Sequence, residues 1–300
     1  MLSRNEVIMD SNEVTLVVSD LDGTLLDSQK NVGQRTKEAI EDLKNKGILF
    51  GIASGRPVES IIKLSKKWGI DDSISFIIGM NGGAMYDNRL HQKEEFANMD
   101  GELLLSVIKF IRQGVDKHFG KVHFEVMDGN TRYVEWSSPY TLENADLYGE
   151  AEVIKDLDSY MPGRRFDKLI IRSDPQDQPA LIEYSKGYQS PMFNAFATAN
   201  DLFEYVDPQI NKGYGLQKIC DHYGLDLAHV VAFGDEANDV EMLSLAGNGV
   251  AMKNATLPAR MASNIILDHT NDEEGEARYI QDEILANAKG ELDTPYVKMG

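Results

Sequence analysis

The stretch VTLVVSDLDGT, residues 14–24, decides how the rest of the chain is interpreted. Its first six residues form a short run rich in β-branched apolar side chains, which is typical of a strand buried in a parallel sheet. The run ends at Asp20, and Asp22 follows two residues later. The sequence therefore predicts a buried strand whose carboxyl end presents two carboxylates.

Helices and strands alternate along the chain after this stretch. The predicted helices lie at 32–46, 58–68, 213–223 and 239–246, and the predicted strands at 48–53, 74–78, 229–233, 249–252 and 264–267. This alternation predicts an α/β fold with a doubly wound, parallel, Rossmann-like sheet. In such sheets ligands bind beyond the carboxyl ends of the strands.

Between the two halves of this pattern, from residue 87 to 197, the order of elements changes. The segment is predicted to hold a long helix, a hairpin, a strand and a second helix, at 101–118, 128–130, 168–172 and 179–188. This mixture indicates an α+β domain inserted into a surface loop of the first domain. We therefore expect a core formed by 1–86 and 198–300, interrupted by an inserted domain at 87–197.

Composition excludes several classes of protein. Of the 300 residues, 42% are hydrophobic and 26% charged, as in folded globular proteins. The net charge of −19 disfavours a nucleic-acid partner, because affinity for nucleic acid rests on Lys and Arg. The single cysteine, Cys220, is expected to be a buried thiol. Since no apolar run approaches the roughly 18 residues of a membrane span and the start does not resemble a signal peptide, we expect a cytoplasmic protein without a membrane partner.

The DLDGT motif suggests a nucleophile beside an acid/base group. A carboxylate can attack phosphorus when a metal ion offsets the repulsion of the phosphate oxygens, and Asp20 is our candidate. Asp22 would protonate the leaving oxygen and later deprotonate a water. Gly23 permits a tight turn. Taken alone, the motif is also compatible with an acidic turn that caps the next helix.

A second motif, Ala53-Ser54-Gly55-Arg56-Pro57, follows the second predicted strand. The Ser54 hydroxyl and the exposed amides after it can donate to phosphoryl oxygens, helped by the amino end of the next helix. Ser54 is equally compatible with a helix N-cap and no more. Its predicted position beside the first strand favours the functional interpretation.

Two motifs in the last third of the chain complete the candidate site. Lys212, at the start of a predicted helix, is a cation that can pair with the nucleophile and the phosphoryl group, although a single lysine is usually solvated. GDEAND, residues 234–239, again places acids after a strand. Such oxygen ligands suit Mg²⁺, with Asp235 as direct ligand and Asp239 orienting Lys212 or a metal-bound water. This loop, too, is compatible with simple helix capping.

The four motifs DLDGT, ASGR, NKG and GDEAND, in this order, resemble the haloacid dehalogenase-like hydrolase superfamily and specifically its Cof-type phosphatases. The resemblance runs from about residue 14 to 280. The inserted segment is similar in position and length to the family's larger α/β cap.

The resemblance implies a role for each matching residue. Asp20 would be the nucleophile and a metal ligand. Asp22 would be the general acid and base, and its backbone carbonyl would bind the metal. Asp235 would be the remaining ligand of Mg²⁺. The groups implied to hold the phosphoryl group are Ser54, Gly55, Lys212, Asn238 and the Leu21 amide. Asn81 would face the substrate or shape its loop, and Thr24, like Asp239, would support the site from outside the direct contacts.

These observations predict a phosphatase of small phosphorylated metabolites, such as a sugar phosphate or a phosphorylated cofactor or its precursor. A mutase would use the same aspartyl-phosphate with a sugar alcohol as acceptor. A non-catalytic phosphometabolite sensor is a third hypothesis, which the intact pair of aspartates disfavours. Trp136, Tyr140 and Arg132 in the insert are candidates for specificity but are equally compatible with packing or surface roles.

Overall fold

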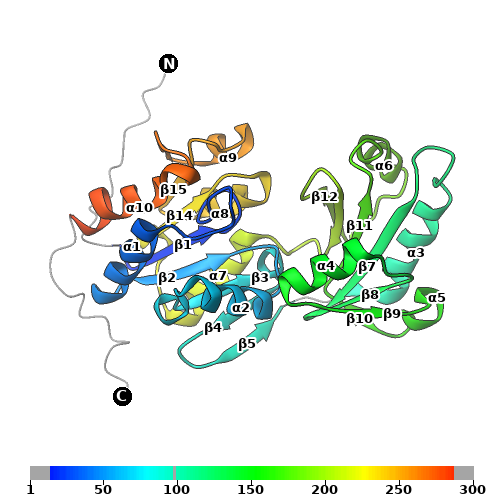
Figure 1. The fold of residues 1–300 in the computed structure, drawn as a ribbon, viewed down its shortest axis with the longest axis horizontal. Coiled ribbons are helices and arrows are strands. Elements are labelled where there is room, and N and C mark those ends of the chain that lie inside the picture. Colours follow the sequence, from blue (N-terminus) through cyan, green and yellow to red (C-terminus); the bar gives the residue numbers. More distant parts are fainter. Residues whose placement is uncertain (1–13, 97–98, 287–300) are drawn as a thin grey trace. The chain divides into compact units, whose positions relative to one another are not determined.

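The computed structural model describes residues 14–96 and 99–286 (Figure 1). These described residues divide into two compact units. The first unit comprises those within 1–55, 65–94 and 211–300, and the second those within 56–64 and 95–210. Each unit is built around a sheet of its own.

Among the described residues, the first unit contains an eight-stranded sheet in the order β16-β15-β14-β1-β2-β3-β4-β5. The strands are β1 (Leu16–Asp20), β2 (Leu49–Ala53), β3 (Phe76–Gly79), β4 (Ala84–Asp87), β5 (Gln92–Glu95), β14 (Val230–Gly234), β15 (Asn248–Ala251) and β16 (Ile265–Ile266). The pairs from β16 to β3 are parallel, whereas β4 is antiparallel to β3. All five residues of β1 are buried between β14 and β2, which explains its continuous apolar run.

Helices connect these strands. They are α1 (Gln34–Asn45), α2 (Val58–Trp68), α7 (Lys212–Tyr223), α8 (Val240–Leu245), α9 (Leu257–Ala262) and α10 (Gly275–Tyr279). The predicted α/β class is confirmed, and each predicted core element is present to within two residues at either end. Gly47, with a φ of 75°, follows the end of α1 as predicted, and Cys220 is buried within α7. No helix in the described part of the chain is long and apolar enough to cross a bilayer.

The second unit contains a six-stranded sheet in the order β12-β13-β11-β7-β8-β9 among its described residues. Its strands are β7 (Val122–Asp128), β8 (Thr131–Val134), β9 (Ala151–Ile154), β11 (Lys168–Ser173), β12 (Asn194–Ala197) and β13 (Leu202–Val206), and β6 (Met99–Asp100) pairs separately with β10 (Arg165–Phe166). The predicted hairpin is the β7–β8 pair, which turns at Gly129 and Asn130. Gly129 has a φ of 55°, as this tight turn requires.

The two faces of this second sheet differ in chemistry. On one face Phe124 and Ile171 join an apolar core with residues of α3 (Gly101–Arg112), α5 (Leu157–Tyr160) and α6 (Gln178–Ser185). The alternate residues of β7 and β11 lie on the other face, because successive side chains of a strand point to opposite sides. They include His123, Glu125 and Arg172. The remaining helix, α4 (Pro139–Tyr148), begins five residues after β8 ends.

Two predictions about the insert differ from the structure. The helix predicted over 101–118 ends at Arg112, because Gly114 lies against the Phe119 ring and Asp116 adopts a left-handed φ of 61°. The second compact unit also reaches to residue 210 rather than 197. Its last strand, β13, pairs with both β11 and β12, so the residues after 197 belong to this sheet.

Candidate active site

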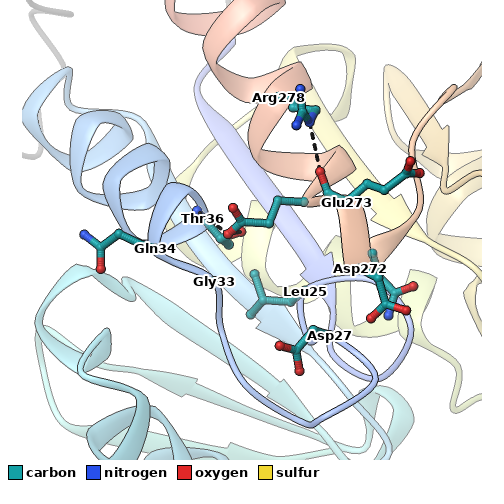
Figure 2. Close-up of a pocket in the computed structure, with 10 residues that line it drawn as sticks. Leu25, Asp27, Gly33, Gln34, Thr36, Asp272, Glu273 and Arg278 are labelled. Carbon is teal, nitrogen blue, oxygen red and sulfur yellow. Dashed lines mark hydrogen bonds between the residues drawn. The ribbon is translucent and has the colours of Figure 1, made fainter.

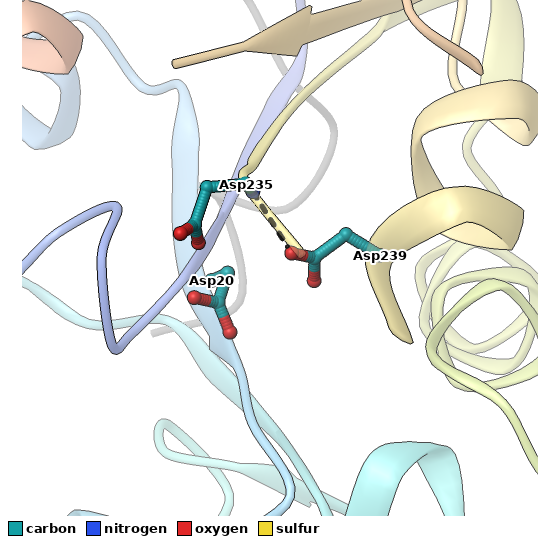
Figure 3. A group of neighbouring side chains, drawn as sticks. All are labelled: Asp20, Asp235 and Asp239. Atoms are coloured by element: carbon teal, nitrogen blue, oxygen red, sulfur yellow. Dashed lines mark hydrogen bonds between the residues drawn. The ribbon is translucent and has the colours of Figure 1, made fainter. Parts of the chain in front are cut away.

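The carboxyl ends of neighbouring parallel strands gather the predicted site residues. β1 ends at Asp20, and Asp235 directly follows β14. Ser54 follows β2, and its amide donates to the Ile78 carbonyl of β3 at 2.9 Å. Figure 3 shows the carboxylates of Asp20, Asp235 and Asp239 close together, and one oxygen of each lies within 4.8 Å of the others.

Lys212 is fully buried at the first position of α7. The Asn211 side chain caps this helix by accepting from the Tyr214 amide at 2.8 Å, which fixes where the lysine begins the helix. Lys212 Nζ donates to Asp20 Oδ1 and, at 2.6 Å, to Asp239 Oδ1. One buried cation thus connects the end of β1 with the loop after β14.

Asp239 uses its second oxygen to hold the loop that carries Asp235. Its Oδ2 accepts from the amides of Asp235 at 2.9 Å and Glu236 at 3.0 Å. A Cβ on Gly234 would lie 2.7 Å from Asp239 atoms, so only glycine permits this close approach. Asp239 therefore orients both Lys212 and the acidic loop.

Two side chains hold the carboxylate of Asp235. Thr24 Oγ1 donates to its Oδ1 at 3.0 Å, and Asn254 Nδ2 lies 3.4 Å from its Oδ2. A Cβ on Gly23, whose φ is 95°, would lie 2.3 Å from that Oδ2, so the glycine of DLDGT serves both the turn and this contact. Asn254 also donates to the Gly23 carbonyl at 2.8 Å. Asn254 was not predicted from the sequence, where its only signal is its place in the loop after β15.

The electrostatics of the cluster favour a bound cation. Burial raises the pKa of Asp20 well above its usual value; Lys212 opposes the shift, and the charges of Asp239 and Asp235 add to it. Burial, followed by the charge of Asp239, raises the pKa of Asp235 to about 7 against the hydrogen bond from Thr24. Burial disfavours the charged form of Lys212, but Asp20 and Asp239 together raise its pKa, so it stays protonated. The site holds more acidic groups than Lys212 alone neutralises.

The donor set fits a hard divalent metal ion. Both oxygens of the Asp239 carboxylate already accept hydrogen bonds, one from Lys212 and the other from two backbone amides. Asp20 and Asp235 are buried carboxylates, and a cation between them would remove their mutual repulsion. Carboxylate oxygens of this kind suit Mg²⁺. The cluster can therefore hold a metal ion between Asp20 and Asp235.

Asp22 lies nearer the solvent than the other acids of the site. Its side chain is 36% exposed, and Lys30 Nζ donates to its Oδ1 at 2.8 Å. Lys30 sits in a tight turn with a φ of 62°, and its carbonyl accepts from Trp68 Nε1 at 3.2 Å. A partly exposed carboxyl can exchange protons with water, which an acid/base group requires.

The residues predicted to hold the phosphoryl group also meet in the first unit. Asn238 Nδ2 donates to Asn81 Oδ1 at 3.2 Å, and the Asn81 amide donates to the Ser54 carbonyl at 3.0 Å. A Cβ on Gly55 would lie 3.1 Å from the Asn81 side chain. Asn81 itself has a left-handed φ of 54°. Non-glycine residues in this conformation cluster at functional sites, where the surroundings compensate the strain.

A buried acid lies behind the strand that carries Asp20. Ser19 Oγ lies 2.7 Å from the Asp20 carbonyl oxygen and 2.7 Å from Glu276 Oε2. A hydroxyl has one proton, so Ser19 donates to the carbonyl only when Glu276 donates to Ser19. Burial raises the pKa of Glu276 to about 8, with the Ser19 hydrogen bond opposing the shift. Glu276 is therefore protonated at neutral pH.

Replacing Glu276 by glutamine tests this assignment. The folded protein binds a proton here up to about pH 8, whereas the unfolded chain releases it near 4.5, so the stability of the wild type falls as pH rises between these values. Each pKa unit corresponds to about 1.4 kcal/mol. We expect Glu276→Gln to match the wild type at pH 5 and to exceed it in urea unfolding at pH 8.5. Parallel curves across this range would contradict a protonated Glu276.

The specificity candidates of the insert lie on the second unit. Arg132 is 3% exposed and lies 3.0 Å from Glu125 Oε2, besides its ion pair with Glu150, so it supports the sheet. Trp136 and Tyr140 are exposed. Of the three candidates, Arg132 therefore has a packing role, whereas Trp136 and Tyr140 lie at the surface.

A cavity of about 310 Å³ lies elsewhere in the first unit (Figure 2). Its acids already accept hydrogen bonds from the backbone: Glu274 Oε1 from the Thr36 amide at 3.3 Å, and Asp272 Oδ1 from the Ser28 amide at 2.6 Å. None of the predicted phosphoryl or metal-binding residues lines it. The cavity therefore lies apart from the candidate active site, and its acidic residue Glu274 holds the start of α1.

The chain is similar in sequence and in structure to known hydrolases and phosphatases. A 5-amino-6-(5-phospho-D-ribitylamino)uracil phosphatase from Bacillus subtilis, YitU, is 29% identical over 272 residues, covering 89% of this chain and 96% of that protein. An HMP-PP phosphatase from Cronobacter sakazakii is 28% identical, covering 79% of this chain and 83% of that protein. A haloacid dehalogenase-like hydrolase from Bacteroides thetaiotaomicron superposes with a TM-score of 0.75 at 28% identity, covering 90% of this chain and 99% of that structure.

The family assignment rests on most of the chain. The family model described as haloacid dehalogenase-like hydrolase matches residues 17–280, which include all of β1 but its first residue, all of β14 and the four motifs above. The resemblance found in the sequence is thereby confirmed. The chain belongs to the haloacid dehalogenase-like hydrolase family.

Proposed function

We propose that the protein is a Mg²⁺-dependent phosphatase of small phosphorylated metabolites that forms a covalent phosphoryl intermediate on Asp20. The observation that carries this proposal is the fully buried Lys212 bridging Asp20 and Asp239, with Asp235 beside them. Relatives named as phosphatases of a ribitylaminouracil phosphate and of HMP-PP support a small-metabolite substrate.

In the first half of the reaction Asp20 displaces the leaving group. Lys212 holds Oδ1, so the other carboxylate oxygen is oriented to attack phosphorus. A bond forms between that oxygen and phosphorus while the bond from phosphorus to the substrate oxygen breaks. Asp22 gives its proton to the departing oxygen, which leaves as an alcohol.

In the second half water replaces the enzyme at phosphorus. Asp22, now a carboxylate, takes a proton from the water, whose oxygen attacks phosphorus. The bond to Asp20 breaks, inorganic phosphate leaves and the Asp20 carboxylate is restored. Ser54, Asn81 and Asn238, linked to one another around the strand ends, orient the phosphoryl oxygens in both halves.

The metal requirement follows from the charge of the site. Asp20, Asp235 and the Asp22 carbonyl would hold Mg²⁺, with Asp239 and Thr24 fixing their positions. When bound, the ion offsets the negative charge of the carboxylates and the phosphoryl oxygens.

Removing the metal should stop turnover. We expect phosphate release from a panel of phosphorylated sugars, nucleotides and cofactors with Mg²⁺ and none with EDTA. Because a ligand of the folded state stabilises it, by about 2.7 kcal/mol at one hundred times its Kd, Mg²⁺ should also raise the melting temperature. Asp235→Asn should lose this rise, whereas Asp221→Asn, on the surface of α7, should keep it. An undiminished rise in Asp235→Asn would refute the ligand assignment.

The second unit, in this proposal, acts as a cap that excludes water during the first half-reaction. The insertion of its residues 95–210 between β5 and α7 of the first unit supports this role. Small-angle scattering with and without a phosphate-mimicking inhibitor tests it, and identical profiles would count against a mobile cap.

We place the protein in the cytoplasm because a lone buried cysteine suits a reducing compartment, which cell fractionation can check.

A further inference from the structure

The sheet of the second unit ends in an open edge strand, β12. Among the described residues β12 stands first in the strand order of this sheet and pairs only with β13. Three of its four residues are exposed, and the fourth, Phe196, is half-buried. An edge strand presents backbone N–H and C=O groups that its own sheet does not pair, so a strand of another chain can pair with it.

β12 also lacks the charged side chains that protect other edges. The stretch from residue 187 to 200, which contains β12, has no charged residue. By contrast, β5 at the edge of the first unit's sheet has the sequence Gln-Lys-Glu-Glu, and β9 at the opposite edge of the second sheet contains Glu152. Charges on an edge strand keep it from pairing with a strand of another chain. The edge at β12 has no such protection.

A second stretch of the same length without charge shows where such strands lie in this chain. Residues 73–86 contain β3 and most of β4, and each of these strands has a neighbouring strand on both sides. The composition of β12 is therefore that of an interior strand, although the described part of the chain gives it one neighbour.

The backbone of β12 directs matched groups outward. The Thr198 amide, directly after β12, donates to the Leu202 carbonyl at 3.1 Å, so these two residues face each other as a hydrogen-bonded pair. Hydrogen-bonded and non-hydrogen-bonded pairs alternate along antiparallel strands. Phe196 therefore directs its N–H and C=O toward β13, whereas Ala195 and Ala197 direct theirs to the open edge. Each of these two small residues offers a donor and an acceptor there.

The acid beside this edge is neutralised inside the sheet. Glu204 lies opposite Phe196 in the β12–β13 register and is 4% exposed. Its carboxylate accepts from Lys168 Nζ at 2.9 Å and from Thr198 Oγ1 at 3.0 Å. With a net charge of −19, two copies of the chain generally repel each other. At β12 they can approach without placing like charges opposite each other.

We propose that β12 is a self-association edge, through which two copies of the chain pair their β12 strands antiparallel about a two-fold axis. The register that uses every outward group of β12 pairs Ala195 of one copy with Ala197 of the other, and each pair exchanges both N–H···O=C bonds. Phe196 then lies opposite Phe196 of the other copy at a non-hydrogen-bonded position, where side chains are closest and an aromatic pair is favourable. A second copy thus matches this edge in backbone direction and in charge. The dimer does not depend on the proposed reaction.

This dimer should form only at high protein concentration. β12 has four residues, and stable interfaces bury at least about 1,200 Å², more than a pair of such strands covers. We therefore expect reversible association, in which the average mass in sedimentation rises with protein concentration. A disulfide at the two-fold axis captures the associated form and is the sharper measurement.

The first test places a cysteine at the two-fold axis. At a non-hydrogen-bonded pair the Cα atoms lie about 4.5 Å apart, within the range of about 4.4–6.8 Å that a disulfide spans. Phe196→Cys should therefore form a disulfide-linked dimer on mild oxidation, and Cys220 does not interfere because it is buried in α7. Asn194→Cys is the matched control, because position 194 faces Thr198 of the other copy and lies about 13 Å from its own counterpart. It should stay monomeric, although residue 194 is more exposed than residue 196.

The second test keeps Phe196 and adds a charge to the edge. Ala197→Lys, at an exposed position, introduces the kind of side chain that protects natural edges, so its mass in sedimentation should not rise with concentration. Gln92→Lys is the control, because Gln92 is exposed on the edge strand β5, and this variant should associate as the wild type does. Thermal melting followed by circular dichroism confirms that both variants are folded at the temperature of the measurement.

Three results would overturn self-association through β12. A Phe196→Cys protein that forms no more linked dimer than Asn194→Cys would exclude the register. Association of Ala197→Lys equal to that of the wild type would place the contact elsewhere on the chain. A wild type that stays monomeric at every concentration would leave the edge to a strand of a different protein and exclude the second copy.

Discussion

Replacing Asp20 by asparagine should lower phosphate release by about 10³-fold or more, as expected when a covalent nucleophile is lost. Asparagine keeps the shape of the side chain, so Lys212 can still donate to its oxygen and the fold should survive. What is lost is the negatively charged oxygen that attacks phosphorus. The measurement is the rate of phosphate release from the best substrate of the panel at saturating Mg²⁺.

A matched control for this experiment is Asp87→Asn. Asp87 is equally buried and lies 2.9 Å from His222 Nε2, but it sits at the end of β4 that pairs with the start of β3, away from the strand ends that gather the site. We expect Asp87→Asn to keep its turnover at a temperature where it is folded. If Asp20→Asn releases phosphate at the wild-type rate, Asp20 is not the nucleophile.

Replacing Lys212 by methionine should destabilise the protein by about 3–5 kcal/mol, the usual effect of removing one partner of a buried ion pair. Methionine fills similar space but leaves the carboxylates of Asp20 and Asp239 buried without their cation. Urea unfolding at pH 7 in EDTA measures the loss. Mg²⁺ should restore part of it, because the ion replaces some of the missing positive charge.

A double mutant identifies the cause of this destabilisation. Adding Asp239→Asn to Lys212→Met removes one of the stranded charges, while the asparagine oxygen can still accept from the amides of the Asp235 loop. The two changes should therefore be less harmful together than the sum of their separate effects. Strict additivity, or a Lys212→Met protein as stable as the wild type, would contradict the coupling between these groups.

The sequence predicted the core because its signals are local. The run before Asp20 is apolar and β-branched, and α2 coincides with the helix predicted over 58–68. Parallel strands align their carboxyl ends, so acids and amides that follow separate strands were expected to lie close together. Asp20 and Asp235 do so, and Ser54 follows Ala53, the residue that pairs with Asp20. The role of Asp239 beside Lys212 followed from the one-turn spacing after Asp235.

The remaining contacts depend on pairing between distant segments, for which a single sequence has no signal. Glu276 reaches Ser19 across 257 residues, and Lys30 meets Asp22 through a turn whose left-handed residue is not a glycine. Asn254 supports Asp235 from a loop with no recognisable motif. The polar face of the second sheet was missed for a similar reason. An alternation of apolar and charged residues predicts an exposed face, whereas Glu125 is buried by its ion pairs.

Trapping the phosphorylated enzyme shows whether Asp20 carries the phosphoryl group. Asp22→Asn with acetyl phosphate should accumulate the intermediate, because acetate leaves without an acid but the water lacks its base. Acid quench, borohydride reduction and peptide mass spectrometry should then find homoserine at position 20. Recovery of unmodified aspartate at this position from protein that has released a stoichiometric burst of acetate, or homoserine elsewhere, would show that Asp20 does not carry the phosphoryl group.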